Sequence, residues 1–501
     1  MILTLRAYNN GMSEGLNRIF GVETEFGCLV ETEDDLGYEA VVEAVKDHVF
    51  HHQRLGAIDL HPRDEAFEPA FSGGFLINGG RLYVDAVGSH EEYATPECRS
   101  ILDLIAADKA GHRIITRALK EIGLEDSVSF YNNSVDHFGG HTFGCHENYL
   151  VRSEDRFLNE SVRFLYPFLV TRQIYAGVGR VGGHRIDYMG ARPDMNDLAL
   201  HPVDYIWVSN VYGVNPDPDV EFQLSQRADH IIKTIASRVR FNRALINPKW
   251  EALYSHGDAT RLHLLFGEAN QMEFAFALKI GTTCLMLDLI ENHLVPERLH
   301  VADPLDTLRK VSRDPAYRWI VQLENEETIP AVDLHREYVT LAETFRGRDE
   351  ETDWTLDNWA ETLDLLEKDP MALADRLDWV AKRKIVEQYM EDQNLGWDAD
   401  ALHSIDMEYH NIDPAKSLFH ALTEMGGART VVNELAIVDA VTEPPGNTRA
   451  YGRAQLVRYL LSQKQPTYWV DWEAVYLDRQ TVVELPDPFE TYADVVKQLG
   501  K

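Results

Sequence analysis

The chain has 501 residues, of which 45% are apolar and 26% are charged, as in ordinary folded globular proteins. This length allows one large domain with an appendage, or two to three smaller domains. The formal net charge of −34 would repel nucleic acid and anionic lipid, so we expect neither as a partner. An anionic ligand would need a local pocket of arginines, backbone N–H groups or metal ions.

Cysteine usage and hydropathy indicate a cytoplasmic location. The four cysteines, at 28, 98, 145 and 284, are widely spaced and form neither a zinc-binding nor a disulfide pattern. The first fifteen residues lack the long apolar segment of a signal peptide, and Lys279 interrupts the most apolar later stretch. We therefore predict free thiols, no export and no membrane-spanning helix.

The first strand is predicted over residues 19–30, IFGVETEFGCLV, where apolar and polar residues alternate between glycines. Residues two apart in a strand point to the same face, so Glu23 and Glu25 project side by side. Burying such a pair is costly without a counter-ion. Carboxylate oxygens are the ligands that Mg²⁺ prefers, which favours a metal site over the alternative of a solvated acidic face.

A helix is predicted over residues 37–52, followed by a polar loop to about residue 74. The segment 75–88, FLINGGRLYVDAVG, is typical of a hairpin turned by glycine, and its second arm places Tyr83 and Asp85 on one face. Asp85 stands at the predicted strand end, where it could act as a base or a nucleophile. A turn-capping aspartate is the structural alternative.

Residues 100–122 predict a helix, and residues 127–151 predict two strands joined by a glycine-rich turn. The second strand carries His146 and Asn148 on one face and Glu147 on the other. Further helices are expected over 150–175, 268–300 and much of 300–430, and residues 181–220 read as an inserted loop region. A small C-terminal domain is expected to begin near residue 432.

Four arginines lie in apolar or small-residue segments: Arg172, Arg227, Arg261 and Arg449. A guanidinium group in such a place needs an acceptor, which a nucleotide phosphate, a substrate carboxylate or an internal salt bridge could supply. The nearby segment GVGRVGG at 177–183 lacks the lysine and hydroxyl residues of a phosphate-binding P-loop. A predicted anion site therefore rests on these four arginines and not on a P-loop.

Ten segments in order resemble the Pup ligase and Pup deamidase family over about residues 19–490. They are FGVETEFG, INGGRLYVD with SHEEYATPEC, NNSVDHFGGHTFGCHENYL, PFLVTRQ, FQLSQRADHI, ALINP, RLH, LKIGTT, LDWVAKRK and PPGNTRA. The resemblance implies an α+β, glutamine-synthetase-like fold: a curved antiparallel sheet cradle packed on helices, with a small C-terminal domain. It implies a tail over 1–18, a catalytic domain over 19–431 and a C-terminal domain over 432–501.

The resemblance also implies chemistry that uses ATP and Mg²⁺ on the C-terminal glutamate or glutamine of the small protein Pup. Ligases of the family phosphorylate this glutamate and join it to a lysine, and deamidases hydrolyse the glutamine or remove Pup. By this resemblance Asp85 is catalytic and Glu23, Glu25, Glu97 and Glu147 bind metal. The expected cofactor-binding residues are Tyr83, His146, Asn148, Arg227, Arg261 and Arg449.

The sequence leaves the branch of the family open. SHEEYATPEC and FGVETEFG are similar to the ligases, whereas GVGRVGG, FQLSQRAD, DPMALADRLDW and NTRAYGR are similar to the deamidases. Departures from the family lie where substrate would bind: an extra residue after Asp85, the insertion at 181–220, and KWEALYSHGDATRLH at 249–263. A diverged ligase or phosphotransferase acting on another peptide or small molecule is one alternative, and an inert nucleotide-binding protein that docks a partner is another.

Overall fold

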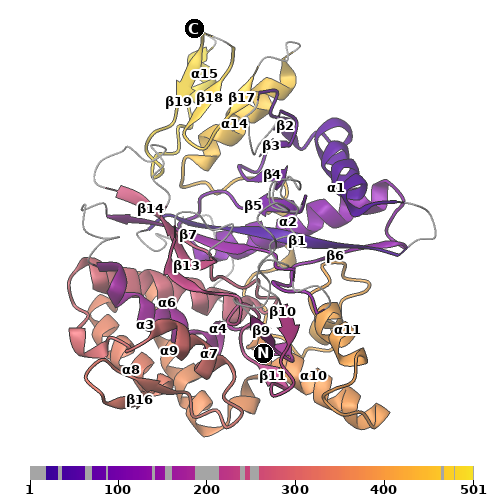
Figure 1. Ribbon diagram of the computed structural model, residues 1–501. Coiled ribbons are helices and arrows are strands. Elements are labelled where there is room, and N and C mark those ends of the chain that lie inside the picture. The colour runs from indigo at the N-terminus through magenta and orange to yellow at the C-terminus, as the bar shows by residue number, and fades with distance from the viewer. Residues whose placement is uncertain are drawn as a thin grey trace, which may run out of the picture.

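A large sheet forms the centre of the molecule. The computed structural model describes residues 18–31, 36–61, 70–85, 89–137, 141–152, 161–186, 214–236, 243–248, 259–463, 468–478 and 480–499. Within these residues a ten-stranded sheet has the order β12-β13-β14-β7-β1-β5-β4-β3-β2, with β6 also paired to β1. All neighbours are antiparallel except β12 and β13. In Figure 1 the sheet separates a lower layer of helices from the C-terminal elements above.

The sheet strands are short apart from the central ones. Their bounds are β1 (Phe20–Val30), β2 (Gly56–Ile58), β3 (Gly73–Leu76), β4 (Arg81–Val84), β5 (Glu91–Ala94), β6 (Val128–Tyr131), β7 (Cys145–Arg152), β12 (Lys233–Ile235), β13 (Ala244–Pro248) and β14 (Ala259–Leu264). The predicted first strand and the hairpin around Gly79 are therefore confirmed. The expected pair over 127–151 exists as β6 and β7, but both pair with β1 and not with each other.

One face of the sheet is covered by helices. Near β4 and β5 the cover consists of α1 (Tyr38–Asp47), its π-helical continuation η1 (His48–His52) and α2 (Ile101–Glu121). Apolar residues on the covered face of β1, such as Val22 and Phe26, are about 98% and 99% buried. Their neighbours Glu23 and Glu25 consequently point to the opposite face, as the alternation of a strand requires.

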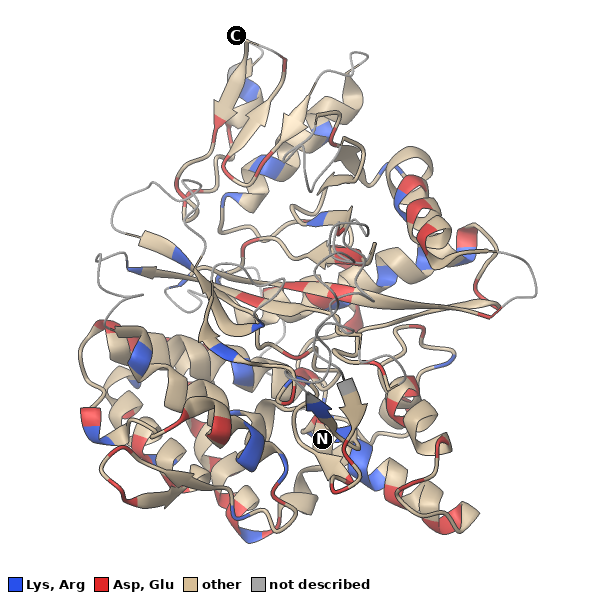
Figure 2. Ribbon diagram, in the orientation of Figure 1, with Lys and Arg blue, Asp and Glu red and all other residues tan. Residues whose placement is uncertain are grey.

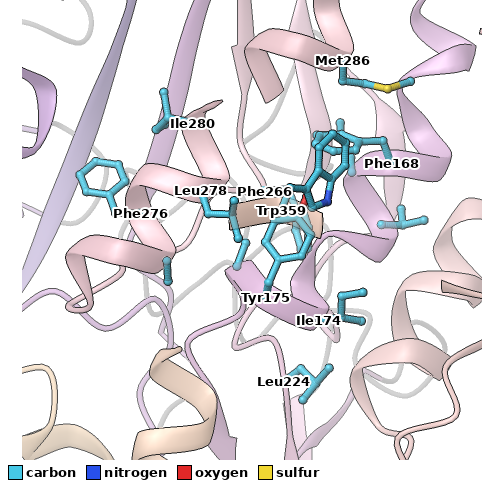
Figure 3. Packing of buried hydrophobic residues seen from close by; sticks show 14 of the residues in the cluster. Phe168, Ile174, Tyr175, Leu224, Phe266, Phe276, Leu278, Ile280, Met286 and Trp359 are labelled. Carbon is cyan, nitrogen blue, oxygen red and sulfur yellow. The ribbon is translucent and has the colours of Figure 1, made fainter. Parts of the chain in front are cut away.

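The main core lies in the lower layer. It is built from η3 (Val162–Phe164), α3 (Tyr166–Thr171), α4 (Gln173–Ala176), α6 (Glu273–Glu291), η6 (Glu297–Leu299), α7 (Pro304–Ser312), α8 (Ala331–Ala342), η7 (Glu343–Phe345) and α9 (Glu350–Lys368). Helix α6 is apolar on all sides because it is enclosed, with Phe276 and Leu278 in the core. Figure 3 shows Trp359 and Phe168 packed beside Tyr175 in this core.

The remaining elements extend this layer. They are β8 (Arg180–Val181), β9 (His184–Ile186), β10 (Val214–Pro216), β11 (Phe222–Gln223), the hairpin of β15 (Ile320–Gln322) and β16 (Thr328–Pro330), η8 (Pro370–Leu373), α10 (Asp378–Gln393), α11 (Ala401–Glu408), α12 (Leu418–Glu424) and α13 (Glu434–Ala440). One prediction needs correction, because residues 150–152 belong to β7 and not to a helix. The predicted helical character of much of 300–430 is confirmed, with one hairpin, β15 and β16, among the helices. Most of the expected insertion, residues 187–213, lies outside the described residues.

The C-terminal elements form a small separate core. Helix α14 (Ala450–Ser462), strands β17 (Trp469–Val470), β18 (Ala474–Tyr476) and β19 (Val482–Glu484), and α15 (Val495–Leu499) pack against Ala57 and Phe75 of the sheet. Val432 and Ile437 belong instead to the main core. Core packing thus favours a boundary later than the predicted residue 432.

The predicted α+β class is confirmed by this mixture of a largely antiparallel sheet and segregated helices. Among the described helices, none is both long and apolar enough to cross a membrane.

Candidate active site

Carboxylates from three neighbouring strands meet on the open face of the sheet. Glu25 lies opposite Glu92 in the register of β1 and β5, and Tyr83 of β4 lies opposite Glu92 on its other side. Asp85 follows the end of β4. Oxygen atoms of Glu25, Asp85 and Glu92 lie within 4.8 Å of one another, and Figure 2 shows acidic residues along β1 and its neighbours. The pleat therefore gathers three acids into one cluster.

The charges in this cluster are partly compensated. His90 Nδ1 lies 2.9 Å from Glu25 Oε2, and although burial alone would raise the pKa of Glu25, contact with His90 lowers it to about 2. Burial raises the pKa of Glu92 well above its ordinary value, and the charges of Glu25 and Asp85 add to this rise. Such a mutual repulsion is the condition that a bound cation relieves.

Glu23 stands in a second, mixed group of side chains. Its carboxylate accepts a hydrogen bond of 2.9 Å from Asn148 Nδ2 and lies 3.4 Å from His146 Nδ1, 3.4 Å from Arg261 and 3.7 Å from His263. Burial opposes ionisation, but the hydrogen bond with His146 and the charges of His263 and Arg261 hold the pKa of Glu23 well below its ordinary value. Glu23 is therefore a carboxylate at neutral pH.

An open pocket adjoins this second group. Its walls come from β1, β7, β14, the segment after β5 and the C-terminal unit. The lining residues that matter for chemistry are Gly21, Glu23, Glu97, Asn148, Arg261 and Trp472. Arg261 is the cationic group at the polar end of this pocket, where it could bind an anion.

Three of the predicted residues bond to other groups of the protein. Glu147 is fully buried on the covered face of β7 and forms a bidentate ion pair with Arg172, with N–O distances of 2.6 and 3.0 Å. Arg227 is buried and donates a hydrogen bond of 2.8 Å to the backbone oxygen of Phe143. Glu147 and Arg172 thus pair with each other on the covered face, and the roles of all three residues in metal or nucleotide binding stay predictions.

Glu97 lines the cavity, but arginines hold its carboxylate. Arg449 Nε lies 2.8 Å from Glu97 Oε1, and Arg453 contacts both carboxylate oxygens. Burial opposes ionisation, yet the charges of Arg453 and Arg449 lower the pKa of Glu97 to about 2. The predicted metal-binding role of Glu97 stays a prediction, and its observed partners are guanidinium groups.

Three residues of the site were missed by sequence reasoning: Glu92, His263 and Trp472. Glu92 could have been found by strand alternation, because in SHEEYA the pair Glu91 and Glu92 must point to opposite faces. His263 follows Leu262, which faces the core, so alternation along the strand places His263 on the opposite face, with Glu23. Trp472 lies between short strands of the C-terminal unit, and no local pattern predicts its contact with the cavity.

The donor set fits a hard divalent cation. Glu25, Asp85 and Glu92 offer carboxylate oxygens, which Mg²⁺ prefers, and Glu92 is buried among like charges. Glu23, His146 and His263 form a second group within the same distance limit, with two imidazole nitrogens. The two groups share strand β1, which places Glu23 and Glu25 side by side.

The fold agrees with comparisons to known proteins. The family described as "Pup-ligase protein" matches residues 18–476, and the chain belongs to this family. It is 33% identical to a depupylase of Acidothermus cellulolyticus over 92% of this chain and 91% of that protein. It is 32% identical to a Pup–protein ligase of Kineococcus radiotolerans over 96% of this chain and 98% of that protein.

Solved structures give the same assignment. A crystal structure of the complex between the prokaryotic ubiquitin-like protein Pup and its ligase PafA has a TM-score of 0.76 and 29% identity, covering 97% of this chain and 92% of that chain. The structure of PafA with ADP has a TM-score of 0.70 and 29% identity, with 94% and 96% covered. The predicted family is thereby confirmed. Both branches occur among these relatives.

Proposed function

We propose that this chain is an ATP- and Mg²⁺-dependent enzyme that acts on the C-terminal glutamate or glutamine of Pup or a Pup-like protein. One observation carries the proposal: the cluster of Glu25, Asp85 and Glu92 lies on the same strands as the cavity beside Glu23. A cluster of carboxylates that can hold Mg²⁺, next to a pocket lined by an arginine, is the arrangement that phosphoryl transfer needs. The family relatives with Pup in their names support the choice of substrate.

In this proposal the nucleotide occupies the cavity with its base towards Trp472 and its phosphates towards Glu23 and Arg261. Arg261 is held by Asn148, whose Oδ1 lies 3.1 Å from its NH1 atom. This contact and the nearby Glu23 carboxylate orient the guanidinium group. A guanidinium so fixed can donate to phosphate oxygens without first being ordered, which lowers the entropic cost of binding.

Glu25, Asp85 and Glu92 would hold a cation, and Glu23 with His146 and His263 would complete its surroundings. When bound, Mg²⁺ neutralises charge on the β- and γ-phosphate oxygens. His90 keeps Glu25 ionised and oriented, and the hydrogen bond between Tyr83 and Glu92 restrains the second carboxylate. These contacts orient the two carboxylates before any ligand binds.

Asp85 is the proposed catalytic residue because it belongs to this cluster and follows directly after the end of strand β4. In conjugation, the γ-phosphoryl group passes to the glutamate carboxylate, an acceptor amine attacks the resulting acyl group, and phosphate leaves. Asp85 would then accept the proton of the amine. In amide cleavage, Asp85 would act as nucleophile or as the base that activates water, and ammonia or a lysine amine would leave.

The test is mass spectrometry of Pup after incubation with the purified protein and Mg²⁺-ATP. Pup ending in Gln and Pup ending in Glu are supplied separately, with and without a lysine-bearing acceptor. A loss of ammonia from the glutamine form would assign deamidation, and a Pup–lysine conjugate would assign ligation. ATP turnover that leaves both forms of Pup unchanged would contradict the proposed substrate and favour another carboxylate compound.

A further inference from the structure

Arg453 of α14 lies between the cavity wall and the C-terminal core. Its side chain is fully buried, and its guanidinium carbon lies 4.9 Å from the centroid of the Trp472 ring and 5.0 Å from that of Phe75. The guanidinium donates hydrogen bonds to the backbone oxygens of Trp472 (2.8 Å) and Gly79 (2.7 Å). Arg453 therefore holds Trp472 by both its ring and its backbone.

The same guanidinium is fixed from the opposite side by Glu97. Both carboxylate oxygens of Glu97 contact Arg453, and the backbone oxygen of Glu97 accepts a hydrogen bond of 2.8 Å from Thr448. Glu97 belongs to the segment between β5 and α2, whereas Trp472 lies between β17 and β18. One arginine thus connects two walls of the cavity that are 375 positions apart in the chain.

These contacts exceed what packing of the small core requires. A buried arginine is costly unless most of its donors are used, and an apolar residue would fill the same space at lower cost. Arg453 instead fixes the backbone and ring of a residue that lines the proposed nucleotide cavity. Planar, multiply bonded guanidinium groups restrict orientation in a way that a lysine ammonium does not.

We infer that Arg453 is a positioning residue for nucleotide binding: clamped by Glu97, it holds Trp472 at the cavity wall so that the indole can stack on the base of ATP. The inference rests on the proposed function, because it assumes that the nucleotide binds in this cavity. Because a base binds more tightly when it stacks on an aromatic side chain, we expect ADP to bind about tenfold more weakly when Trp472 is not held.

The experiment compares full-length wild type with Arg453→Lys, Trp472→Ala and the double variant, and measures ADP affinity by calorimetry in the presence of Mg²⁺. Each single variant should weaken ADP binding by about tenfold. The double variant should bind no more weakly than Trp472→Ala, because Arg453 acts through that ring. In turnover assays, KM for ATP should rise while kcat at saturating ATP changes by less than about threefold.

Arg313→Lys is the matched control. Arg313 also bonds two carboxylates and a backbone oxygen, those of Asp217, Asp229 and His184, but it does not line the cavity. It should therefore leave ADP affinity unchanged. If Arg453→Lys does not fold, Glu97→Gln is the second variant. It removes the negative charge that holds Arg453 but keeps the size of the side chain, so it should raise KM for ATP in the same way.

The outcomes separate the inference from the proposed function. Wild type that fails to bind ADP would refute the nucleotide site itself. Wild type that binds ADP, with Arg453→Lys binding equally well, would overturn the positioning role alone. Additive losses in the double variant would also overturn it, because Arg453 would then act independently of Trp472.

Discussion

Replacing Glu92 by glutamine should stabilise the metal-free protein and abolish its response to Mg²⁺. The Glu92 carboxyl is 96% buried and lies within 4.8 Å of Glu25 and Asp85. At that distance two unit charges repel by about 3 kcal/mol at an effective dielectric constant near 20. Burial, together with the charges of Glu25 and Asp85, raises the pKa of Glu92, so its ionised form is disfavoured in the folded protein. We therefore expect Glu92→Gln to gain about 1 to 3 kcal/mol of unfolding free energy without metal.

The assay is thermal unfolding in EDTA and in Mg²⁺-ADP, combined with turnover. A ligand that binds the native state at 100 times its Kd stabilises it by about 2.7 kcal/mol, so wild type should gain stability on adding Mg²⁺-ADP. Glu92→Gln should gain far less and should lose at least about 99% of its activity, because one metal ligand has become neutral.

Glu91→Gln is the control. Glu91 is adjacent in sequence and fully buried, but it points to the covered face, and within the described residues its carboxylate has no hydrogen-bond partner. Burial raises the pKa of this carboxyl too, so its replacement should also stabilise the protein, while the Mg²⁺ response and turnover stay intact. Equal Mg²⁺ responses in wild type and Glu92→Gln would refute the reasoning.

The remaining predictions concern catalysis, pH and packing. Asp85→Asn should abolish Pup turnover while circular dichroism shows that the variant stays folded; undiminished turnover would contradict its role. Burial raises the pKa of Glu351 from 4.5 to about 7 despite hydrogen bonds from Ser100 and Ile101. The folded state therefore holds the proton between these values, so stability should fall by roughly 2 kcal/mol as pH rises from 5 to 7. In denaturant titrations Glu351→Gln should show a much flatter pH dependence than wild type. Trp359→Ala should cost about 3 to 5 kcal/mol of unfolding free energy, and a loss below about 1 kcal/mol would contradict its place in the core.

Alternation within single strands shows what the sequence alone can predict. Alternation in residues 19–30 identifies β1 and places Glu23 and Glu25 on one face, because the period of a strand is a local property. The same local rule separates Glu147 from His146 and Asn148, as the structure confirms. Family resemblance added the role of these carboxylates, and the family itself is confirmed.

The partners of each carboxylate are decided by tertiary structure. Glu25 meets Glu92 because β1 pairs with β5, and Glu23 meets His263 because β14 follows β7 in the sheet. Pairing between distant strands depends on the packing of the whole core, which no short segment specifies.

The ion pair of Glu97 with Arg449 and Arg453 is the clearest case. The sequence alone indicated that Glu97 is an acid near the strands of the predicted metal site and that Arg449 needs an acceptor. Only the docking of the C-terminal unit against the sheet brings them together, since these residues are about 350 positions apart in the chain.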